Sequence, residues 1–167
     1  MTAESWNRHA RIVLGESLVA SSAATFSALV LELPVWAMFV GWIAYFTRGL
    51  NLRSGLVNLV CVLIGLALGM AAAHALAAFS PLLGAYAITA VVTAITAIAL
   101  SLARMPVFNN LLGFFLGLVA YFASHMPPSP ATFLNLGGAA AIGAAAGFLA
   151  HVWQGRVKAS RPGTGRP

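Results

Sequence analysis

The sequence predicts an all-α membrane protein: six transmembrane helices form two inverted three-helix repeats, and helices two and five are short. Three observations predict this fold class. Of the 167 residues, 60% are hydrophobic and only 7% are charged. The chain also divides into six apolar segments, and the pattern of the first three returns in the last three. Since a water-soluble domain carries about a quarter charged residues, much of this surface must face lipid.

The six apolar segments are bounded by proline, glycine or charged residues. Crossing a hydrocarbon core of ~30 Å takes about 20 helical residues, which the first, third, fourth and sixth segments supply. The second and fifth are short and open with Pro34 and Pro106, at a position where the missing N–H of proline would be unpaired anyway. The segments cover residues 13–33, 34–47, 55–79, 82–103, 106–124 and 131–153.

All nine lysines and arginines lie between or outside these segments. If the N-terminus is cytoplasmic, six crossings place all of them on the cytoplasmic side, and the outer connections around Glu32, Ser80 and Met126 hold none. Positive charge is retained on the cytoplasmic side of membrane helices, so the distribution predicts six crossings with both termini cytoplasmic. The basic residues are Arg8, Arg11, Arg48, Arg53, Arg104, Arg156, Lys158, Arg161 and Arg166.

The first segment loosely imitates a cleaved signal peptide. Glu16 falls inside what would be the apolar region, and the run continues to Leu33, longer than such a region needs. We therefore expect a retained first helix with Glu16 in its first turn, where the helix dipole favours a carboxylate. The expected organisation is a cytoplasmic segment (1–12), a first repeat (13–79), an inverted second repeat (82–153) and a disordered basic cytoplasmic tail (154–167).

The most informative feature is an internal repeat. Residues 39–46 read Phe-Val-Gly-Trp-Ile-Ala-Tyr-Phe, and residues 115–122 read Phe-Leu-Gly-Leu-Val-Ala-Tyr-Phe, 76 positions later. Further matches occur in the same order on both sides, at offsets between 72 and 78. They pair Pro34 with Pro106, Asn58 with Asn135, Gly65 with Gly143, Gly69 with Gly147, and His74 with His151.

Each repeat contains three crossings, so the second repeat must enter the membrane from the opposite face. The sequence therefore predicts an inverted repeat about an axis in the membrane plane. Short helices at matching places in two such halves are the best sequence indication of a solute path. The candidate pathway residues are Glu32, Trp36, Gly41, Tyr45, Asn58, Phe108, Asn109, Asn110, Gly117, Tyr121 and Asn135.

The polar candidates also admit structural interpretations. Carboxamides inside apolar helices can mark a pathway, or they can hydrogen-bond neighbouring helices and cap helix ends. Glu32 precedes the second segment, where it could act as a proton or cation site or be stabilised by the positive end of the helix dipole.

Glycines spaced four apart form stripes of small residues. Such stripes allow helix backbones to approach closely, which drives association where no hydrophobic effect acts between helices. We expect packing within the chain, with a subunit interface as the alternative. The stripe residues are Gly65, Gly69, Gly113, Gly143 and Gly147.

Several functions are unsupported by the residue inventory. No basic run interleaves with aromatic residues, which argues against nucleic-acid binding. His74, His125 and His151 lack metal-ligand spacing, so we expect no metal and no cofactor. Paired carboxylates, a phosphate-binding loop and a histidine cluster are missing from the sequence, so we expect no catalytic residues and no enzymatic activity. Cys61 has no partner in the chain and its expected role is packing.

The Pro-x-Trp motif and the two Ala-Tyr-Phe motifs give the chain a family resemblance. It resembles the YcdZ-like small bacterial inner-membrane proteins, a domain-of-unknown-function family, over roughly residues 18–152. The resemblance implies a multi-pass protein of the bacterial inner (plasma) membrane and supplies no catalytic residues.

We expect a channel or transporter for a small neutral or weakly polar solute, because charges inside the segments are few. The protein would lie in the lipid bilayer as a homo-oligomer. The alternative is a non-transporting membrane subunit that anchors, captures substrate for, or modulates a partner complex.

Overall fold

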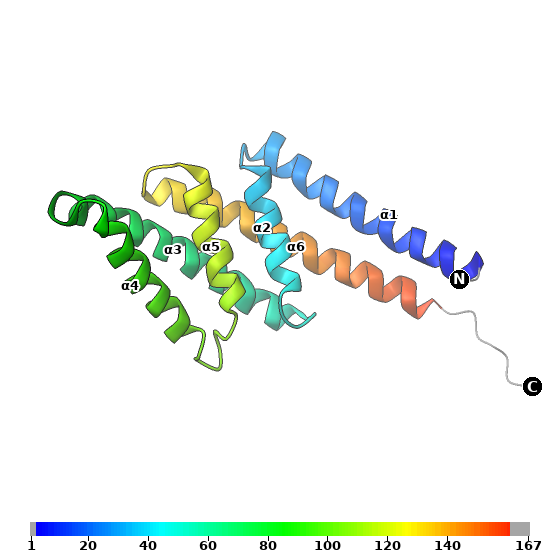
Figure 1. Cartoon of the computed structure of the whole chain (residues 1–167). Coiled ribbons are helices and arrows are strands. Elements are labelled where there is room, and N and C mark those ends of the chain that lie inside the picture. Colours follow the sequence, from blue (N-terminus) through cyan, green and yellow to red (C-terminus); the bar gives the residue numbers. More distant parts are fainter. Residues whose placement is uncertain (1–2, 161–167) are drawn as a thin grey trace, which may run out of the picture.

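The computed structural model describes residues 3–160, which form six α-helices and no strand (Figure 1). The predicted all-helical class is confirmed. Three stretches, Glu4–Val30, Leu52–Leu83 and Pro130–Ala159, are long and apolar enough to cross a membrane. The helices are α1 (Ala3–Thr25), which continues into the π-helical turn η1 (Phe26–Val30), α2 (Val35–Phe46), α3 (Leu52–Leu83), α4 (Tyr86–Leu102), α5 (Leu111–Ser124) and α6 (Pro130–Ala159).

The helices differ widely in length. At 1.5 Å per residue, the 32 residues of α3 extend about 48 Å, well beyond a hydrocarbon core of ~30 Å. The 12 residues of α2 and the 14 of α5 extend only about 18 and 21 Å. A helix longer than the core is accommodated by tilting, so α3 and α6 are suited to an inclined arrangement.

Each short helix packs mainly against the long helix of the other half of the sequence. α2 packs against α6, and α5 packs against α3. On the outside, α1 runs beside α6 and α4 runs beside α3 (Figure 1). The long helices also contact each other, and so do the two short ones.

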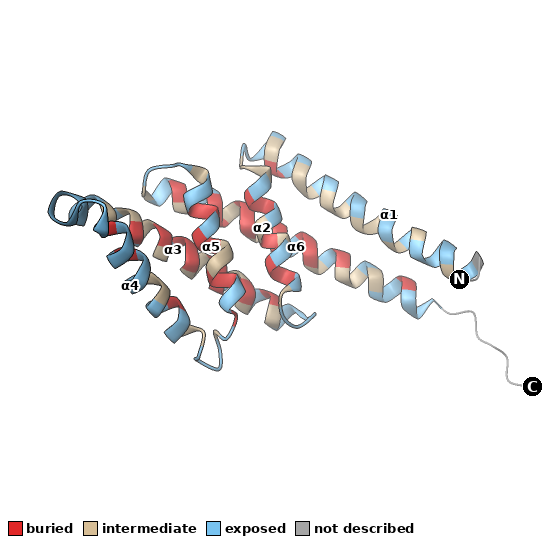
Figure 2. Cartoon of the chain, in the orientation of Figure 1, coloured by how far each residue is buried: buried red, intermediate tan, exposed pale blue. Residues whose placement is uncertain are grey.

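The core lies where α2, α3, α5 and α6 meet. Figure 2 shows buried residues concentrated in these four helices, whereas α1 and α4 are mostly exposed or half-buried. The exposed sides of the outer helices are apolar, as in Leu18, which is 66% exposed, and Ile88, which is 61% exposed. A large exposed apolar surface is suited to contact with lipid. The central cluster contains Ala37, Met38, Leu66, Ala120, Tyr121, Leu136 and Ala139.

Both ends of the helical region extend further than the sequence predicts. α1 begins at Ala3, inside the segment assigned to residues 1–12, so Glu16 lies in mid-helix and not in the first turn. Its carboxylate accepts a hydrogen bond from Gln154 Nε2 at 3.2 Å. α6 continues to Ala159, so the first six residues of the predicted tail, 154–159, are helical where α6 packs beside α1. The remainder of that tail, residues 161–167, lies outside the described residues.

Two prolines do not mark the helix boundaries predicted from them. α3 passes through Pro81 and ends at Leu83, and the C-cap residue Gly84 has a φ of 53°, which glycine adopts without steric cost. α5 begins five residues after Pro106, because the side chain of Asn110 accepts a hydrogen bond from Gly113 N at 3.1 Å and caps the helix there. Pro34 is the N-cap residue of α2, one position before the helix.

Candidate functional site

A buried polar cluster joins the end of α2, the first third of α3 and the start of α5. The Asn110 Nδ2 atom donates to Asn58 Oδ1 at 2.8 Å and to Thr47 Oγ1 at 2.7 Å. The Asn58 Nδ2 atom donates to the carbonyl oxygens of Arg48 at 2.9 Å and Tyr45 at 3.4 Å. The cluster therefore links three helices through side chains that are far apart in the sequence.

The hydrogen-bonding capacity of this cluster is well used. Asn58 is fully buried and Asn110 is 5% exposed. Both N–H groups of each carboxamide have an acceptor, and each carboxamide oxygen has a donor. Such a satisfied network is rigid, so it fixes the end of α2 and the start of α5 against α3.

A polar cavity of about 530 Å³ lies next to this cluster. Asn58 borders both. Arg48 and Arg53 are exposed at its rim, so its mouth is hydrophilic and positively charged. The cavity is lined by Arg48, Asn51, Arg53, Ser54, Val57, Asn58, Pro106 and Val107.

Glycines make the closest helix contacts in the chain. A Cβ added to Gly41 in α2 would overlap the carbonyl oxygen of Ala140 in α6, and one added to Gly143 would overlap that of Met38 in α2. No side-chain rotation can relieve an overlap with backbone.

The second pair of helices repeats these contacts. A Cβ added to Gly117 in α5 would overlap the carbonyl oxygen of Val62 in α3, and one added to Gly65 would overlap that of Phe114. One turn further, Tyr121 covers Gly69 in α3 as Tyr45 covers Gly147 in α6. A Cβ added to Gly113 in α5 would lie 2.8 Å from the Cβ of Cys61 in α3. All five predicted stripe glycines thus lie at helix contacts within the chain.

The structure brings only part of the predicted pathway set together. Tyr45, Asn58 and Asn110 meet in the polar cluster, while Gly41, Gly117 and Tyr121 lie buried at the helix crossings. Phe108 is half-buried, and its carbonyl oxygen accepts a hydrogen bond from Cys61 Sγ at 3.9 Å. The exposed members are Glu32, Trp36, Asn109 and Asn135.

Two of the exposed residues differ from their expected environments. Glu32 is exposed, has a positive φ of 53°, and lies two residues before Pro34, the N-cap residue of α2, which makes no side-chain capping hydrogen bond. Asn135 is exposed, while the next residue, Leu136, is buried. Counting seven positions back from Gly65 gives Asn58, and counting seven back from Gly143 gives Leu136. Asn135 therefore is not the counterpart of Asn58 in the packing of the helices.

Sequence reasoning missed Thr47 as a member of the polar cluster. Its hydroxyl accepts from Asn110 and donates to the Ala44 carbonyl oxygen at 2.7 Å. The available signal was its place directly after the Ala-Tyr-Phe motif, where the second repeat has Ala123. The hydrogen bonds of Thr47 therefore have no equivalent at Ala123 in the second repeat.

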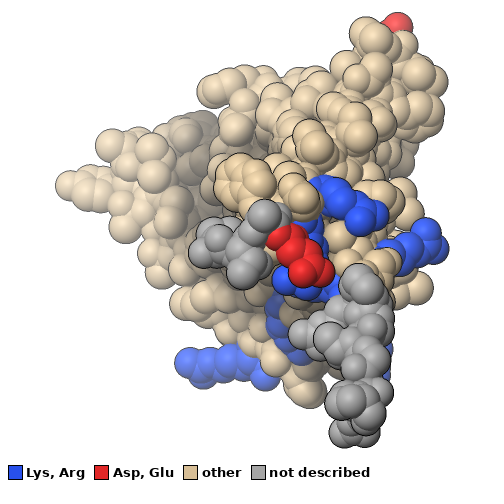
Figure 3. All heavy atoms as spheres, turned by 90° about the vertical axis from the view of Figure 1, so that its right-hand side faces the viewer, with Lys and Arg blue, Asp and Glu red and all other residues tan. Residues whose placement is uncertain are grey.

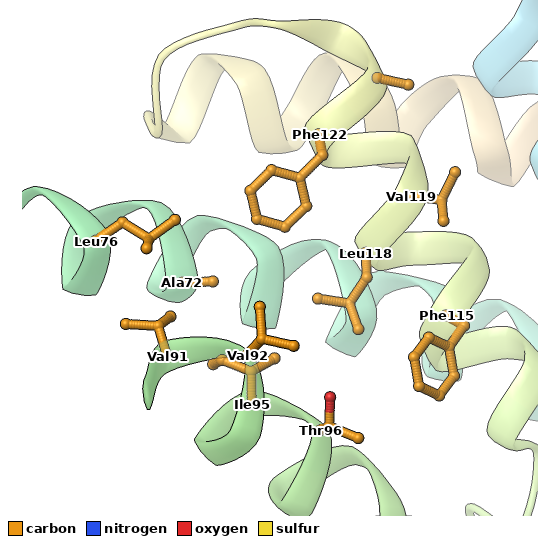
Figure 4. A pocket seen from close by; sticks show the side chains of 11 residues that line it. Ala72, Leu76, Val91, Val92, Ile95, Thr96, Phe115, Leu118, Val119 and Phe122 are labelled. Atoms are coloured by element: carbon orange, nitrogen blue, oxygen red, sulfur yellow. The ribbon is translucent and has the colours of Figure 1, made fainter. Parts of the chain in front are cut away.

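An apolar cavity of about 330 Å³ lies between α3, α4 and α5. Figure 4 shows the side chains of Leu76, Ile95 and Leu118 directed toward it from these three helices. Thr96 is the only polar side chain among the described residues that line it.

Basic side chains lie at the end of the bundle where α1 begins and α6 ends. Figure 3 shows Lys and Arg side chains collected on the face where α1 begins and α6 ends. Arg8, Arg156 and Lys158 are exposed there. Within residues 3–160, no group of three or more His, Cys, Asp or Glu side chains is placed to hold a metal ion.

Comparison with known proteins identifies a family. No curated protein sequence and no solved structure matches the chain. A family model described as "Protein of unknown function (DUF1097)" matches residues 13–154. Since this match covers most of the sequence, the chain belongs to the DUF1097 family.

Proposed function

We propose that this protein crosses the bacterial inner membrane six times, as two inverted repeats, and conducts a small neutral or weakly polar solute along the short helices α2 and α5. Its termini lie in the cytoplasm, and it works as a homo-oligomer because six such helices enclose little volume. Within its family we place it with the YcdZ-like proteins.

The repeated helix contacts carry this proposal. Gly41 and Tyr45 of α2 pack against Ala140 and Gly147 of α6. The residues 76 positions later in α5, Gly117 and Tyr121, pack in the same way against Val62 and Gly69 of α3. A repeat in packing as well as in sequence supports two halves related by an axis in the membrane plane. Transporters of this construction place their solute path at the repeat interface, beside interrupted helices.

The path proposed here starts at the polar cavity and leads past the polar cluster. Beyond it lies the central apolar cluster, in which Met38, Leu66 and Leu136 are each at most 1% exposed. Apolar constrictions of this kind close a path by excluding water. The arrangement supports a closed state that must open at Met38 for solute to pass.

The proposed topology makes a direct prediction. Reporters fused to the two ends, and cysteines placed at Arg53 and Arg104, are expected on the cytoplasmic face. A cysteine at Glu32 or Met126 is expected to react with a membrane-impermeant maleimide added to whole cells. Labelling of the Arg104 position from outside would contradict six crossings.

Solute flux is the test of the proposed activity. Liposomes containing the purified protein are expected to take up glycerol or urea faster than empty liposomes, as followed by light scattering after rapid mixing. Met38→Ala is expected to raise the rate because it shortens the side chain at the constriction. Leu134→Ala is the matched control, because Leu134 is 69% exposed on the outside of α6. Liposomes with this variant should take up solute at the wild-type rate.

The apolar cavity favours a second candidate function. A groove with a single polar side chain could seat a transmembrane helix of another protein, which would make this chain a membrane subunit that anchors or modulates a complex. Two results together would support this second function. Liposomes with wild-type or Met38→Ala protein would show no more flux than empty liposomes, and crosslinking would recover one stoichiometric partner protein.

A further inference from the structure

Two buried polar atoms on neighbouring aromatic rings have no hydrogen-bond partner within the described residues. They are the hydroxyl oxygen of Tyr45 in α2 and the Nδ1 atom of His151 in α6. Tyr45 is only 1% exposed. The centroids of the two rings are 6.3 Å apart, and the ring planes are inclined at 45°. The two rings are therefore neighbours in the fold, and each carries one polar atom without a partner.

A cavity of about 170 Å³ adjoins Tyr45, between α2, α3 and α6. One water molecule requires only roughly 10–15 Å³ of such space, so a molecule of several heavy atoms fits. Tyr45 supplies the only hydrogen-bonding side chain among the described residues that line the cavity, and no charged side chain lines it. Its other walls are leucine, glycine, alanine and phenylalanine.

The chemistry of the walls limits what the cavity can bind. A buried hydroxyl or imidazole nitrogen without a partner is costly, so a bound molecule with hydrogen-bonding groups is favoured over an apolar one. An ion would lose its hydration with no charged side chain to compensate, which is far more costly. A molecule in the cavity must therefore be neutral and hydrogen-bond to the Tyr45 hydroxyl; His151 lies beside Tyr45 but does not line the cavity, so a second hydrogen bond to its Nδ1 atom requires the molecule to extend past the Tyr45 ring.

We propose that Tyr45 and His151 form a binding site for a small neutral solute that carries both a hydrogen-bond donor and an acceptor, such as an amide or a polyol. The Tyr45 O–H donates to the solute oxygen, and a solute N–H or O–H donates to His151 Nδ1. This inference rests on the proposed function, of which it names the solute class.

The other repeat does not reproduce the site. Tyr121 holds the position of Tyr45 over its glycine, but its hydroxyl is not a buried atom without a partner. His74, which matches His151 in sequence, is exposed. The proposed site is therefore specific to the end of the bundle near Arg48, and Tyr121 provides a matched control for Tyr45.

Nuclear magnetic resonance on the full chain in lipid nanodiscs tests the site. The protein is labelled with ¹⁵N-histidine, and the signals of His151 are assigned by their absence in His151→Gln. Acetamide is expected to shift the Nδ1 resonance in a saturable way. Tyr45→Phe should weaken this binding by roughly five- to tenfold, as expected for one lost hydrogen bond, whereas Tyr121→Phe should titrate as wild type.

Each result is decisive. A resonance that acetamide never shifts overturns the site, even if water fills the cavity, and so does equal binding by Tyr45→Phe and wild type. If acetamide binds in a saturable way, Tyr45→Phe weakens this binding, and the protein shows no flux in liposomes, then the binding site stands and the proposed solute passage is wrong. Flux in liposomes without an acetamide-dependent shift at His151 would support solute passage and reject the binding site.

Discussion

Replacing Gly143 with leucine is expected to destroy the packing of α2 on α6. An added Cβ would overlap the Met38 carbonyl oxygen and lie 2.7 Å from the Trp42 nitrogen, so only a separation of the two helices can make room. Overpacking of an ordinary core costs about 1–3 kcal/mol, with larger values where backbone must move. We expect more than about 3 kcal/mol here, because in lipid close contact itself drives helix association.

The same substitution elsewhere in α6 provides the control. A Cβ added to Gly155 meets no atom within 4 Å, so Gly155→Leu should leave stability unchanged or raise it slightly, since glycine inside a helix costs up to about 1 kcal/mol relative to alanine. Unfolding in nanodiscs, followed by circular dichroism, measures both variants. Gly117→Leu should behave as Gly143→Leu does. A Gly143→Leu protein as stable as Gly155→Leu would refute the contact.

The broad features of the fold follow from local sequence properties. Low charge and long apolar segments predict helices in lipid whatever the details of packing, and the glycine stripes indicate which helix faces make close contact. Those glycines recur at a fixed spacing. The α2–α6 and α3–α5 helix pairs cross with the same geometry, and each crossing needs a residue without a side chain at the same position. Because of this regularity, the sequence alone pairs Gly65 with Gly143.

Helix boundaries and the polar cluster depend on contacts that local sequence does not specify. Pro106 is compatible with a first helical turn, but α5 begins at its Asn110 cap, which is held in place by Asn58 and Thr47. These partners are 52 and 63 positions away, beyond any local pattern. The sequence match pairs Asn135 with Asn58 at an offset of 77, one residue short of the glycine offset. One residue on a helix turns a side chain by about 100°, enough to move it from the core to the surface.

Removing the carboxamide of Asn110 is the second large effect we expect. Asn110→Leu deletes the cap of α5, worth about 1 kcal/mol. It also leaves Asn58 Oδ1 buried without a donor, at a cost of about 1–3 kcal/mol. We therefore expect a loss of about 2–4 kcal/mol in the free energy of unfolding. The adjacent Asn109 is exposed, and Asn109→Leu should change stability by no more than about 0.5 kcal/mol.

A double-mutant cycle separates the broken network from the lost cap. The position in α6 that corresponds to Asn58 holds Leu136, which is buried at 1% exposure, so leucine is accommodated at the equivalent site in the other half. Asn58→Leu combined with Asn110→Leu should therefore cost less than the sum of the two single changes, by about 1 kcal/mol or more, because neither carboxamide is left without its partner. Equilibrium unfolding of the four proteins in the same nanodiscs measures this coupling. Strictly additive costs would show that Asn58 and Asn110 act independently and that the polar cluster is not one cooperative network.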